Sequence, residues 1–386
     1  MASPRTMESG EDGGCPLPED LVVEVLRRLP YRSLCRARCI CKSWRDLSYH
    51  PDHRWRLPQD LSGLLYTNHA PSRRAHGGSF FRFAPAGSSP FPGLGFLPCG
   101  ARARPLDCCN GLLLCRGGGG ADRCYYVCNP ATGKFAALPK PAAGFQAMAL
   151  AAFEPHGASP HGASPRFHVL NFARPEPVRR DLLSRNESWV QGLEVFSSHT
   201  GRWVQSHACS DTRFRLVEGM GSVFVNGFVN LLTLEKKVLA VDPEGRACRL
   251  IFLPVATWFR FGCLGQSQGF LQYAVQEDRV FPMMQVWALT DFEEGDWVLK
   301  HRFDIEVAPP KDIMSDYAGI NSRFHVFYVV VFHPEKDLVF LPVEGYKLLS
   351  YNLITAEVKE ICMLDPKKRP RFLVYVPSYV DLPNIW

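Results

Sequence analysis

The sequence lacks a run of apolar residues long enough to cross a membrane, which takes about 18 to 20 residues. The longest apolar run, around Val326 to Phe332, ends at His333 and Pro334. Residues 1–15 contain no apolar core of the kind that a secretory signal needs, so we expect a disordered leader there. We expect neither a membrane protein nor a secreted one, and the expected location is the cytoplasm, the nucleus or both.

The chain also lacks a strong excess of one charge. It carries 44 lysines and arginines against 38 aspartates and glutamates, a formal net charge of +6. This mild balance gives no reason to expect nucleic acid or a membrane surface as a partner. One basic cluster, Lys367 to Arg371, fits either a nuclear import signal or a solvated loop between strands.

Motifs for metal binding and catalysis are missing as well. Fourteen cysteines occur without paired Cys-x-x-Cys units, and Cys124 and Cys128 have no second pair nearby. We therefore expect no metal, and buried free thiols in a reducing compartment. There is no Gly-x-Ser-x-Gly, no His-Glu-x-x-His and no Gly-x-Gly-x-x-Gly at a strand–helix turn. The sequence predicts no catalytic residue, no cofactor and no enzymatic activity.

What the sequence does have is concentrated in residues 17–47. Apolar residues recur there at helical spacing, and five of them are expected on one face of a first helix: Leu21, Val22, Val25, Leu26 and Leu29. Pro18 suits the first turn of this helix, and Pro30 ends it. The stretch is amphipathic and flanked by prolines, which indicates a helical unit built to contact another surface.

Two further helices are expected after Pro30. Ser33 is a candidate N-cap for a second helix, whose apolar positions are Leu34, Ala37 and Ile40. A third helix is predicted from about Lys42 to Tyr49, with Trp44 and Leu47 inward. Three helices in so few residues bury too little apolar surface to be stable alone. A partner or the rest of the chain should complete the unit.

These residues resemble the F-box motif, with its L-P-x-x-L start, L-P, S-L, Arg-rich turn and C-K-x-W-x-x-L end. The matching positions are Leu17, Pro18, Leu21, Val25, Leu29, Pro30, Ser33, Leu34, Arg36, Arg38, Ile40, Cys41, Lys42, Trp44 and Leu47. The resemblance implies docking on a Skp-type adaptor, which links to a cullin in an SCF ubiquitin ligase. An ordinary amphipathic hairpin at the start of a larger domain is the alternative.

The same resemblance implies which residues bind the adaptor. They form an apolar surface with a basic rim and comprise Leu17, Pro18, Leu21, Val25, Leu29, Pro30, Leu34, Arg36, Arg38, Cys41, Lys42 and Trp44.

After about residue 57 the chain changes to short apolar runs between Gly, Pro, Asn and Asp. Such runs predict β-strands: Leu112–Cys115, Tyr125–Cys128, Arg166–Phe172, Gly192–Phe196, Ser222–Val225, Val229–Leu234, Val238–Val241, Arg249–Leu253, Met284–Leu289, Trp297–Arg302, Phe324–Phe332, Leu338–Pro342 and Lys347–Asn352. Many short strands with turn signals favour an all-β sandwich, barrel or propeller.

A hairpin with a polar turn recurs five times along this β region. The turn positions are Gly133, Gly201, Gly245, Gly295 and Ala356. Spacings near 40 to 50 residues are typical of four-stranded propeller blades, and wider gaps leave room for loops. We predict a propeller of about six blades, with a pair of packed sheets as the alternative.

The start of this region resembles the F-box-associated domain of plant F-box proteins, a kelch-like propeller. The resemblance rests on Cys108-Cys-Asn-Gly-Leu-Leu-Leu-Cys and on Tyr126-Val-Cys-Asn-Pro-Ala-Thr-Gly-Lys. True kelch repeats carry a Gly-Gly pair with spaced Tyr and Trp in every blade, and this pattern is absent, so the resemblance concerns architecture only.

The expected organisation is α+β, with a short three-helix F-box followed by an all-β domain. Residues 1–15 are the leader, 16–56 the F-box, 57–104 a linker with the first β segment, and 105–386 the propeller-like domain. The resemblances imply a substrate-recognition subunit of an SCF ligase, which binds an adaptor through the F-box and a target protein through the β domain. The alternatives are a scaffold or regulator outside a ligase, and a propeller enzyme or sugar-binding module.

Overall fold

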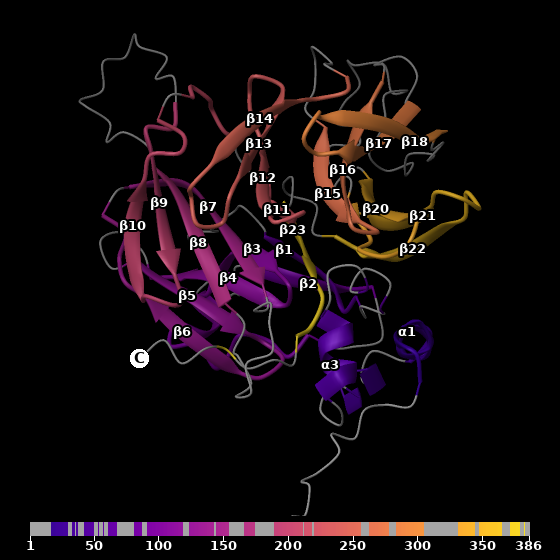
Figure 1. Ribbon diagram of the computed structural model, residues 1–386, viewed down its shortest axis with the longest axis horizontal. Helices are drawn as coiled ribbons and strands as arrows, with labels where there is room; N and C mark the ends of the chain where they lie inside the picture. Colours follow the sequence, from indigo (N-terminus) through magenta and orange to yellow (C-terminus); the bar gives the residue numbers. More distant parts are fainter. Residues whose placement is uncertain are drawn as a thin grey trace, which may run out of the picture. The chain divides into compact units, whose positions relative to one another are not determined.

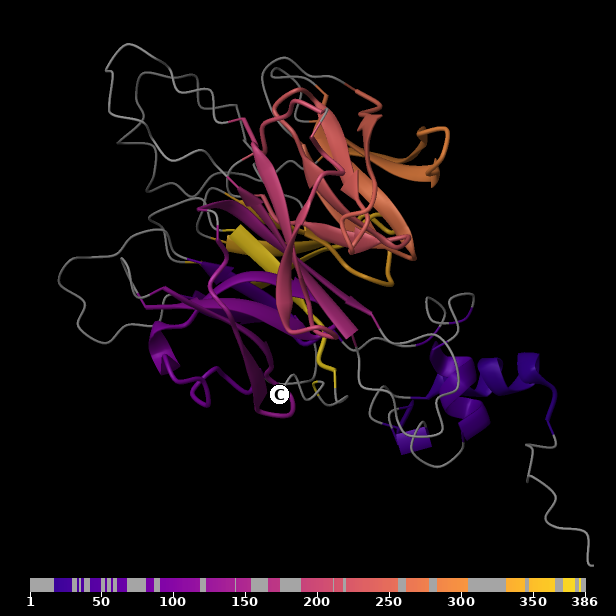
Figure 2. The same cartoon turned by 60° about the vertical axis from the view of Figure 1, so that its left-hand side comes forward.

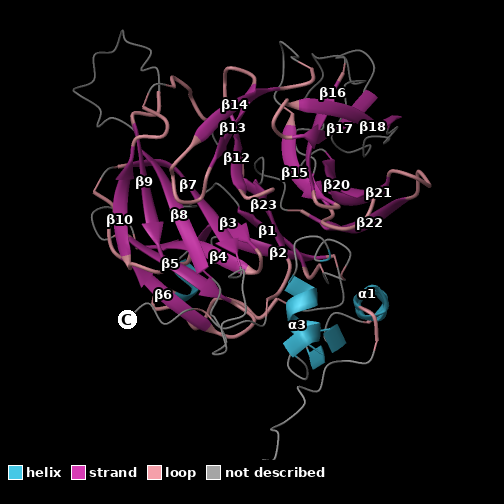
Figure 3. Ribbon diagram, viewed as in Figure 1, coloured by secondary structure: helices cyan, strands magenta, loops and turns pink. Residues whose placement is uncertain are grey.

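A computed structural model of the chain describes residues 17–29, 33–34, 36–37, 42–49, 53, 57, 61–67, 81–86, 91–118, 123–142, 144–153, 166–173, 189–210, 212–217, 220–255, 262–277, 283–304, 331–343, 347–364, 371–378 and 382. The chain separates into two units, Met1–Pro58 and Gln59–Trp386. The α-helices lie in the first unit and the strands in the second (Figure 3).

Helix α1 (Glu19–Arg28) begins directly after Pro18. The Pro18 carbonyl oxygen accepts hydrogen bonds from the amides of Leu21 and Val22, at 3.0 and 3.1 Å. The acidic residues of the first turn and the basic residues of the last turn complement the helix dipole. The helix ends because Leu29, with φ −74° and ψ 141°, is extended. A residue that precedes a proline is pushed out of the helical region in this way.

Helix α3 (Lys42–Tyr49) has the bounds that the sequence predicts for a third helix. Leu47 is buried and Trp44 is partly buried, as predicted. Between α1 and α3, four residues are described as helical: Ser33, Leu34, Arg36 and Ala37. Two complete α-helices are thus described, and the second helix of the predicted three stays a prediction.

The second unit contains six antiparallel sheets. Five of them have four strands, in sequence order from one edge to the other: β3 (Arg104–Cys109), β4 (Leu112–Gly117), β5 (Cys124–Asn129) and β6 (Lys134–Leu138); β7 (Phe145–Phe153), β8 (Arg166–Ala173), β9 (Gly192–Ser197) and β10 (Arg202–Ser206); β11 (Val223–Val225), β12 (Phe228–Leu232), β13 (Lys237–Val241) and β14 (Cys248–Phe252); β15 (Cys263–Ser267), β16 (Phe270–Gln276), β17 (Met283–Asp291) and β18 (Asp296–Asp304); β19 (Val331–Phe332), β20 (Leu338–Val343), β21 (Lys347–Asn352) and β22 (Val358–Met363). These sheets follow one another around the second unit (Figure 1).

The sixth sheet joins strands from both ends of the second unit. It contains β1 (Gly63–Thr67), β2 (Phe81–Pro85) and β23 (Arg371–Tyr375), in the order β2-β1-β23. The yellow strand β23 lies among the violet and purple strands from the other end of this unit (Figure 2). Strand β23 also contacts β3 of the next sheet. The sheets therefore form a closed ring, which confirms a propeller with six blades and excludes the pair of packed sheets.

Apolar contacts between neighbouring sheets hold the ring together. Each neighbouring pair of sheets shares a cluster of buried side chains. Between the first two four-stranded sheets, for example, Leu114, Val127, Phe167 and Phe196 are all fully buried. In the four-stranded sheets the middle strands are covered on both faces, so their apolar residues run continuously rather than alternating, as in β4 and β13.

The predicted hairpin repeat is confirmed at all five positions. The backbone φ is positive, between 57° and 80°, at Gly133, Gly201, Gly245, Gly295 and Ala356. In four of these turns the amide at this position donates to the carbonyl oxygen four residues earlier, at 2.9–3.0 Å. The Gly245 amide instead donates to Asp242, three residues earlier, at 2.8 Å. Asx side chains before the turns accept further amides, as Asp291 does from Glu293 and Glu294.

A second repeated turn connects the first two strands of three sheets. Its two central residues both have positive φ, as two-residue hairpins of type I′ require: Asn110-Gly111, Asn226-Gly227 and Gln268-Gly269. This second repeat was not predicted, although the Asn-Gly pairs at 110–111 and 226–227 are a sequence signal for it.

Most predicted strands are present. All the runs listed from Leu112 to Lys347–Asn352 overlap observed strands, although most of Phe324–Phe332 lies outside the described residues. Strand β7, with the sequence FQAMALAAF, was not predicted. Its alanines and Met148 have low strand propensity and no alternation, and only the neighbouring sheets make this segment a strand.

Asp107 on β3 connects four sheets near the first strand of each. One carboxylate oxygen accepts the amide of Leu150 on β7 at 2.8 Å and the hydroxyl of Ser222, which precedes β11. The other oxygen lies 3.8 Å from the guanidinium of Arg371 on the closing strand β23. Burial raises the pKa of this carboxyl, while the Arg371 charge and these hydrogen bonds oppose the rise.

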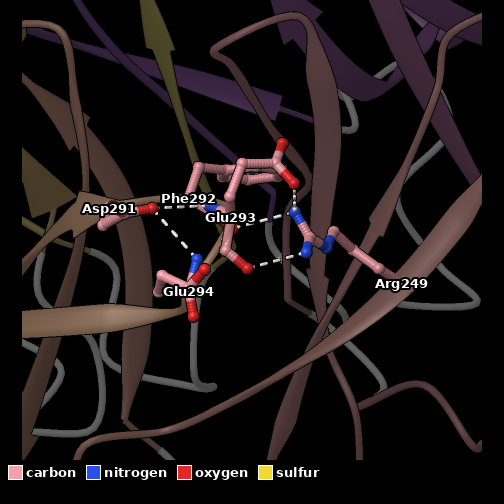
Figure 4. Close-up of polar contacts among 5 residues, drawn as sticks. All are labelled: Arg249, Asp291, Phe292, Glu293 and Glu294. Carbon is pink, nitrogen blue, oxygen red and sulfur yellow. Dashed lines mark hydrogen bonds and ion pairs between the residues drawn. The ribbon is translucent and has the colours of Figure 1, made fainter.

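Neighbouring sheets are also joined at their outer strands. Arg249 on β14 donates to the carbonyl oxygens of Phe292 and Glu293, at 3.0 and 2.8 Å, and to the Glu293 carboxylate at 2.9 Å (Figure 4). The acceptors lie in the turn between β17 and β18 of the next sheet. The indole of Trp297 donates to the Phe252 carbonyl oxygen at 2.9 Å in the same place. The hairpin repeat thus supplies contacts between blades.

We expect Asp107→Ala to lower the free energy of unfolding of the propeller by about 3 kcal/mol or more. The change leaves the Arg371 charge buried without its partner, and removes an acceptor from the Leu150 amide and the Ser222 hydroxyl. Asp107→Asn keeps an acceptor oxygen and should cost less. Chemical denaturation followed by tryptophan fluorescence measures both. Wild-type stability in the alanine variant would contradict a connecting role for Asp107.

We expect Ala356→Gly to stabilise the propeller by about 0.5–1 kcal/mol. Ala356 has φ 57° in a turn where the other four positions are glycine, and a left-handed conformation is strained for any residue with a Cβ. The matched control is Gly133→Ala, because no atom lies within 4 Å of the added Cβ and only the backbone strain changes. Thermal unfolding should show opposite shifts for the two variants.

Candidate functional site

The first unit has a small apolar core that divides the residues of α1 into two groups. Its buried members are Val22, Leu26, Leu34, Ala37, Leu47 and Leu57, and Leu29 and Trp44 pack against them from the edge. Val22 and Leu26 are each 1% exposed. This face of α1 is therefore used for folding and is closed to a partner.

Two apolar side chains of α1, and one in the segment just before it, are exposed. Leu17 is 44% exposed, Leu21 is 53% exposed and Val25 is 41% exposed. Leu21 and Val25 lie four residues apart, which places them side by side on the helix, and Leu17 lies just before the helix begins. We call Leu17, Leu21 and Val25 the outer stripe. Exposed large apolar side chains that are close together are typical of an interaction surface.

The prediction that Leu21, Val22, Val25, Leu26 and Leu29 share one face is therefore wrong. Residues four apart advance by about 40° around a helix, and residues one apart by about 100°. The apolar arc of α1 is wide enough for two faces, one directed to the core and one outward. The periodicity of the sequence detects the whole arc and does not separate the two.

Charged side chains lie beside the outer stripe. Glu24 pairs with Arg27 at 2.9 Å and with Arg28 at 2.8 Å. The hydrogen bond from Arg27 lowers the pKa of the Glu24 carboxyl. These pairs are exposed, so they contribute little to stability. Their effect is to give the surface around the stripe a fixed charge pattern.

The remaining predicted adaptor-binding residues fall into three groups. Pro18, Arg36 and Lys42 are exposed. Leu34 is fully buried, so its side chain supports the core rather than the outer surface, and Leu29 and Trp44 are only partly accessible. Pro30, Arg38 and Cys41 lie outside the described residues.

Two core residues of this unit were not predicted. Val23 is 5% exposed and Leu57 is 2% exposed. Val23 continues the apolar arc of α1, and its place directly after Val22 was the available signal. Leu57 follows Trp55 and Arg56 and belongs to the core of the first unit, so its predicted place in the 57–104 linker is wrong.

The described residues give no sign of an activated nucleophile. Burial raises the pKa of Cys108 well above its usual value, and a hydrogen bond with Cys128 together with burial does the same for Cys115. Such thiols stay protonated and unreactive. Burial lowers the pKa of His333 to about 4, so that its imidazole is neutral near pH 7.

No metal-binding group of three or more His, Cys, Asp or Glu side chains is found among the residues that the structure covers. Within the same residues, no helix has both the length and the apolar character needed to span a bilayer.

Two protein families match the chain. Residues 15–56 match the F-box domain. Residues 99–369 match the family described as "F-box protein At3g26010-like, beta-propeller". The first match contains α1, α3 and the outer stripe, and the second contains the five four-stranded sheets.

Several similar proteins from Arabidopsis thaliana carry F-box names. The F-box protein At5g07610 is 25% identical over 93% of this chain and 90% of its own length. The F-box protein At5g49610 is 26% identical over 74% of this chain and 78% of its own length. The F-box protein At5g65850 is 27% identical over 78% of this chain and 74% of its own length.

The two faces of α1 predict opposite outcomes for neighbouring substitutions. Leu26→Ala removes a fully buried side chain and should destabilise the first unit by about 2–5 kcal/mol. Val25→Ala shortens an exposed side chain and should change stability by no more than about 0.5 kcal/mol. Hydrogen exchange of the α1 amides distinguishes them, with fast exchange only in Leu26→Ala. Equal effects would mean that the inner and outer faces are assigned wrongly.

Proposed function

This chain belongs to the F-box proteins that carry a β-propeller, and from this membership we propose that it is a substrate-recognition subunit of an SCF ubiquitin ligase. In this role the F-box binds a Skp-type adaptor, which connects to a cullin. The propeller binds a target protein, and the ligation chemistry takes place on other subunits. The chain itself is then a non-catalytic adaptor.

The observation that carries the proposal is the outer stripe on α1. Full burial of a leucine or valine contributes about 1.5–3 kcal/mol, so three half-exposed side chains offer roughly 3 kcal/mol. A micromolar complex needs about 8 kcal/mol. The stripe alone is therefore too small, and in this proposal the exposed basic side chains of Arg36 and Lys42 add charge contacts with the adaptor. This combination agrees with the adaptor surface that the F-box resemblance implies.

The propeller supports the other half of the proposal. A closed ring of six sheets is rigid, and a rigid platform keeps a bound target at a fixed position. Joining this platform to an adaptor-binding unit on one chain raises the effective concentration of the target near the ubiquitin-conjugating enzyme. The proposed contribution to catalysis is proximity and orientation.

We place this activity in the cytoplasm, the nucleus or both. The ten cysteines that the structure describes are free thiols, which suits a reducing compartment. The basic cluster that ends at Arg371 is a candidate import signal. A fusion of the chain to a fluorescent protein, with and without lysine and arginine replaced at 367–369, tests it.

We expect Leu21→Glu combined with Val25→Glu to abolish binding to a Skp-type adaptor. Two carboxylates in the outer stripe would have to be desolvated at the interface without a partner. Both positions are exposed, so α1 should stay folded. Co-expression and size-exclusion chromatography should give a one-to-one complex for the wild type and free chain for the variant.

Val204→Glu is the matched control, because Val204 is 61% exposed on β10 of the propeller. It makes the same chemical change on the other unit and should leave the complex intact. Adaptor binding that survives in the α1 double variant would refute the docking surface. A complex that forms with the adaptor but never recruits a cullin would favour a scaffold outside a ligase.

A further inference from the structure

The turn that follows β10 lies against the β13–β14 hairpin of the next sheet. We call this turn, residues 206–210, the joining turn. Its Ser206 hydroxyl donates a hydrogen bond to the carbonyl oxygen of Gly245, which lies between β13 and β14. The thiol of Cys248, the first residue of β14, donates to the carbonyl oxygen of Ala208 at 2.9 Å. The contacts between these two sheets thus include a cysteine thiol.

Residues on both sides of Cys209 in the chain contact the Cys248 sulfur. The Ala208 carbonyl that accepts the thiol belongs to the peptide group leading into Cys209. The Thr212 amide donates to the Cys209 carbonyl oxygen at 3.2 Å, and the Thr212 hydroxyl oxygen lies 4.0 Å from the Cys248 sulfur. Both cysteines also pack against the same apolar cluster. The fold therefore brings two thiols together from neighbouring sheets.

The two thiols influence each other, and both are partly open to small solutes. Each cysteine is half-buried. Burial raises the pKa of the Cys209 thiol, and a hydrogen bond with Cys248 raises it further. This effect of one thiol on the other agrees with the contacts around them.

A second cysteine pair in the propeller has the opposite properties. The sulfurs of Cys115 and Cys128 lie 3.9 Å apart, and both residues are fully buried. Cys115 pairs with Tyr126 and Cys128 pairs with Leu113, so the cysteines occupy diagonal positions on β4 and β5. Cα atoms of diagonal neighbours are about 7–8 Å apart, and a disulfide needs less than about 7 Å. This pair is closed to oxidants and too widely spaced, so it serves as an internal control.

We propose that Cys209 and Cys248 are a modification site at which a peroxide forms a reversible disulfide, which clamps the β7–β10 sheet to the β11–β14 sheet. The bond joins the connection after β10 to the outer strand of the next sheet. The site lies in the propeller, and it does not depend on the proposed function of the chain.

The oxidation takes two steps with hydrogen peroxide as the oxidant. Cys248 reacts first, because a raised pKa leaves little thiolate on Cys209. Its sulfur forms a bond to one peroxide oxygen as the O–O bond breaks, giving a sulfenic acid and water. The Cys209 sulfur then attacks the sulfenic sulfur. The S–S bond forms as the S–O bond breaks, and the hydroxyl leaves as water with the Cys209 proton. Both sulfurs are oxidised, and the peroxide is reduced to two waters.

Mass spectrometry of the full-length chain tests the site. The chain is treated with excess hydrogen peroxide, alkylated, and digested with trypsin without reduction. We expect the peptide 203–213 to be linked to the peptide 247–249, each of which contains one cysteine. Dithiothreitol should release the two peptides. Cys115 and Cys128 should be recovered as thiols in the same sample.

Thermal unfolding measures the clamp. The bond closes a loop of about 40 residues, which restricts the unfolded chain and should raise the unfolding temperature of the propeller by about 5 °C. Dithiothreitol should reverse the rise. The matched control is Cys362→Ser, which replaces another half-buried cysteine on the outer strand β22 and should keep both the link and the rise.

Two single variants separate the steps. In Cys209→Ser the reaction should stop at the sulfenic acid of Cys248, which dimedone captures. In Cys248→Ser, dimedone should not label Cys209. Neither variant should show the rise in unfolding temperature.

The site is refuted if peroxide leaves both cysteines as thiols, or links either one to a different cysteine. An unchanged unfolding temperature in the linked wild type would overturn the clamp. Dimedone labelling of Cys209 in Cys248→Ser would overturn the order of the two steps. The measurements on the wild type need no variant to fold.

Discussion

The pairing of β1 with β23 is the constraint on which the second unit depends. Leu65 pairs with Leu373 across this contact, so strands more than 300 residues apart in the chain share one sheet. The middle strands of the ring are covered on both faces, and each sheet needs both neighbours for this burial. Without the pair, β1 and β2 would have no third strand and two sheets would each expose an apolar face. The pairing of β1 with β23 closes the ring, and we therefore expect the six sheets to unfold together as one cooperative unit.

Local sequence patterns predicted many of the strands and turns of this fold, but they did not predict the strand pairing that closes the ring. The turns at Gly133 and Gly295 are visible in the sequence because a left-handed residue after an Asx-type start leaves a local signature. The turn at Ala356 was also predicted, because this residue has the same place in the repeat as the four glycines. The pairing of β1 with β23 has no such signature, since register between distant segments is decided by burial in the assembled ring. Strand β7 was missed for the same reason.

The helical unit shows a different limit of sequence patterns. Leu21 and Leu26 are equally apolar and both belong to the periodic arc of α1, yet the first is 53% exposed and the second 1%. Burial of Leu26 depends on Leu34 and Leu57, which reach it through the tertiary structure. The F-box pattern marked Leu17, Leu21 and Val25 by resemblance, without distinguishing them from core positions such as Leu34. The structure makes that distinction, because Leu17, Leu21 and Val25 are exposed whereas Leu34 is fully buried.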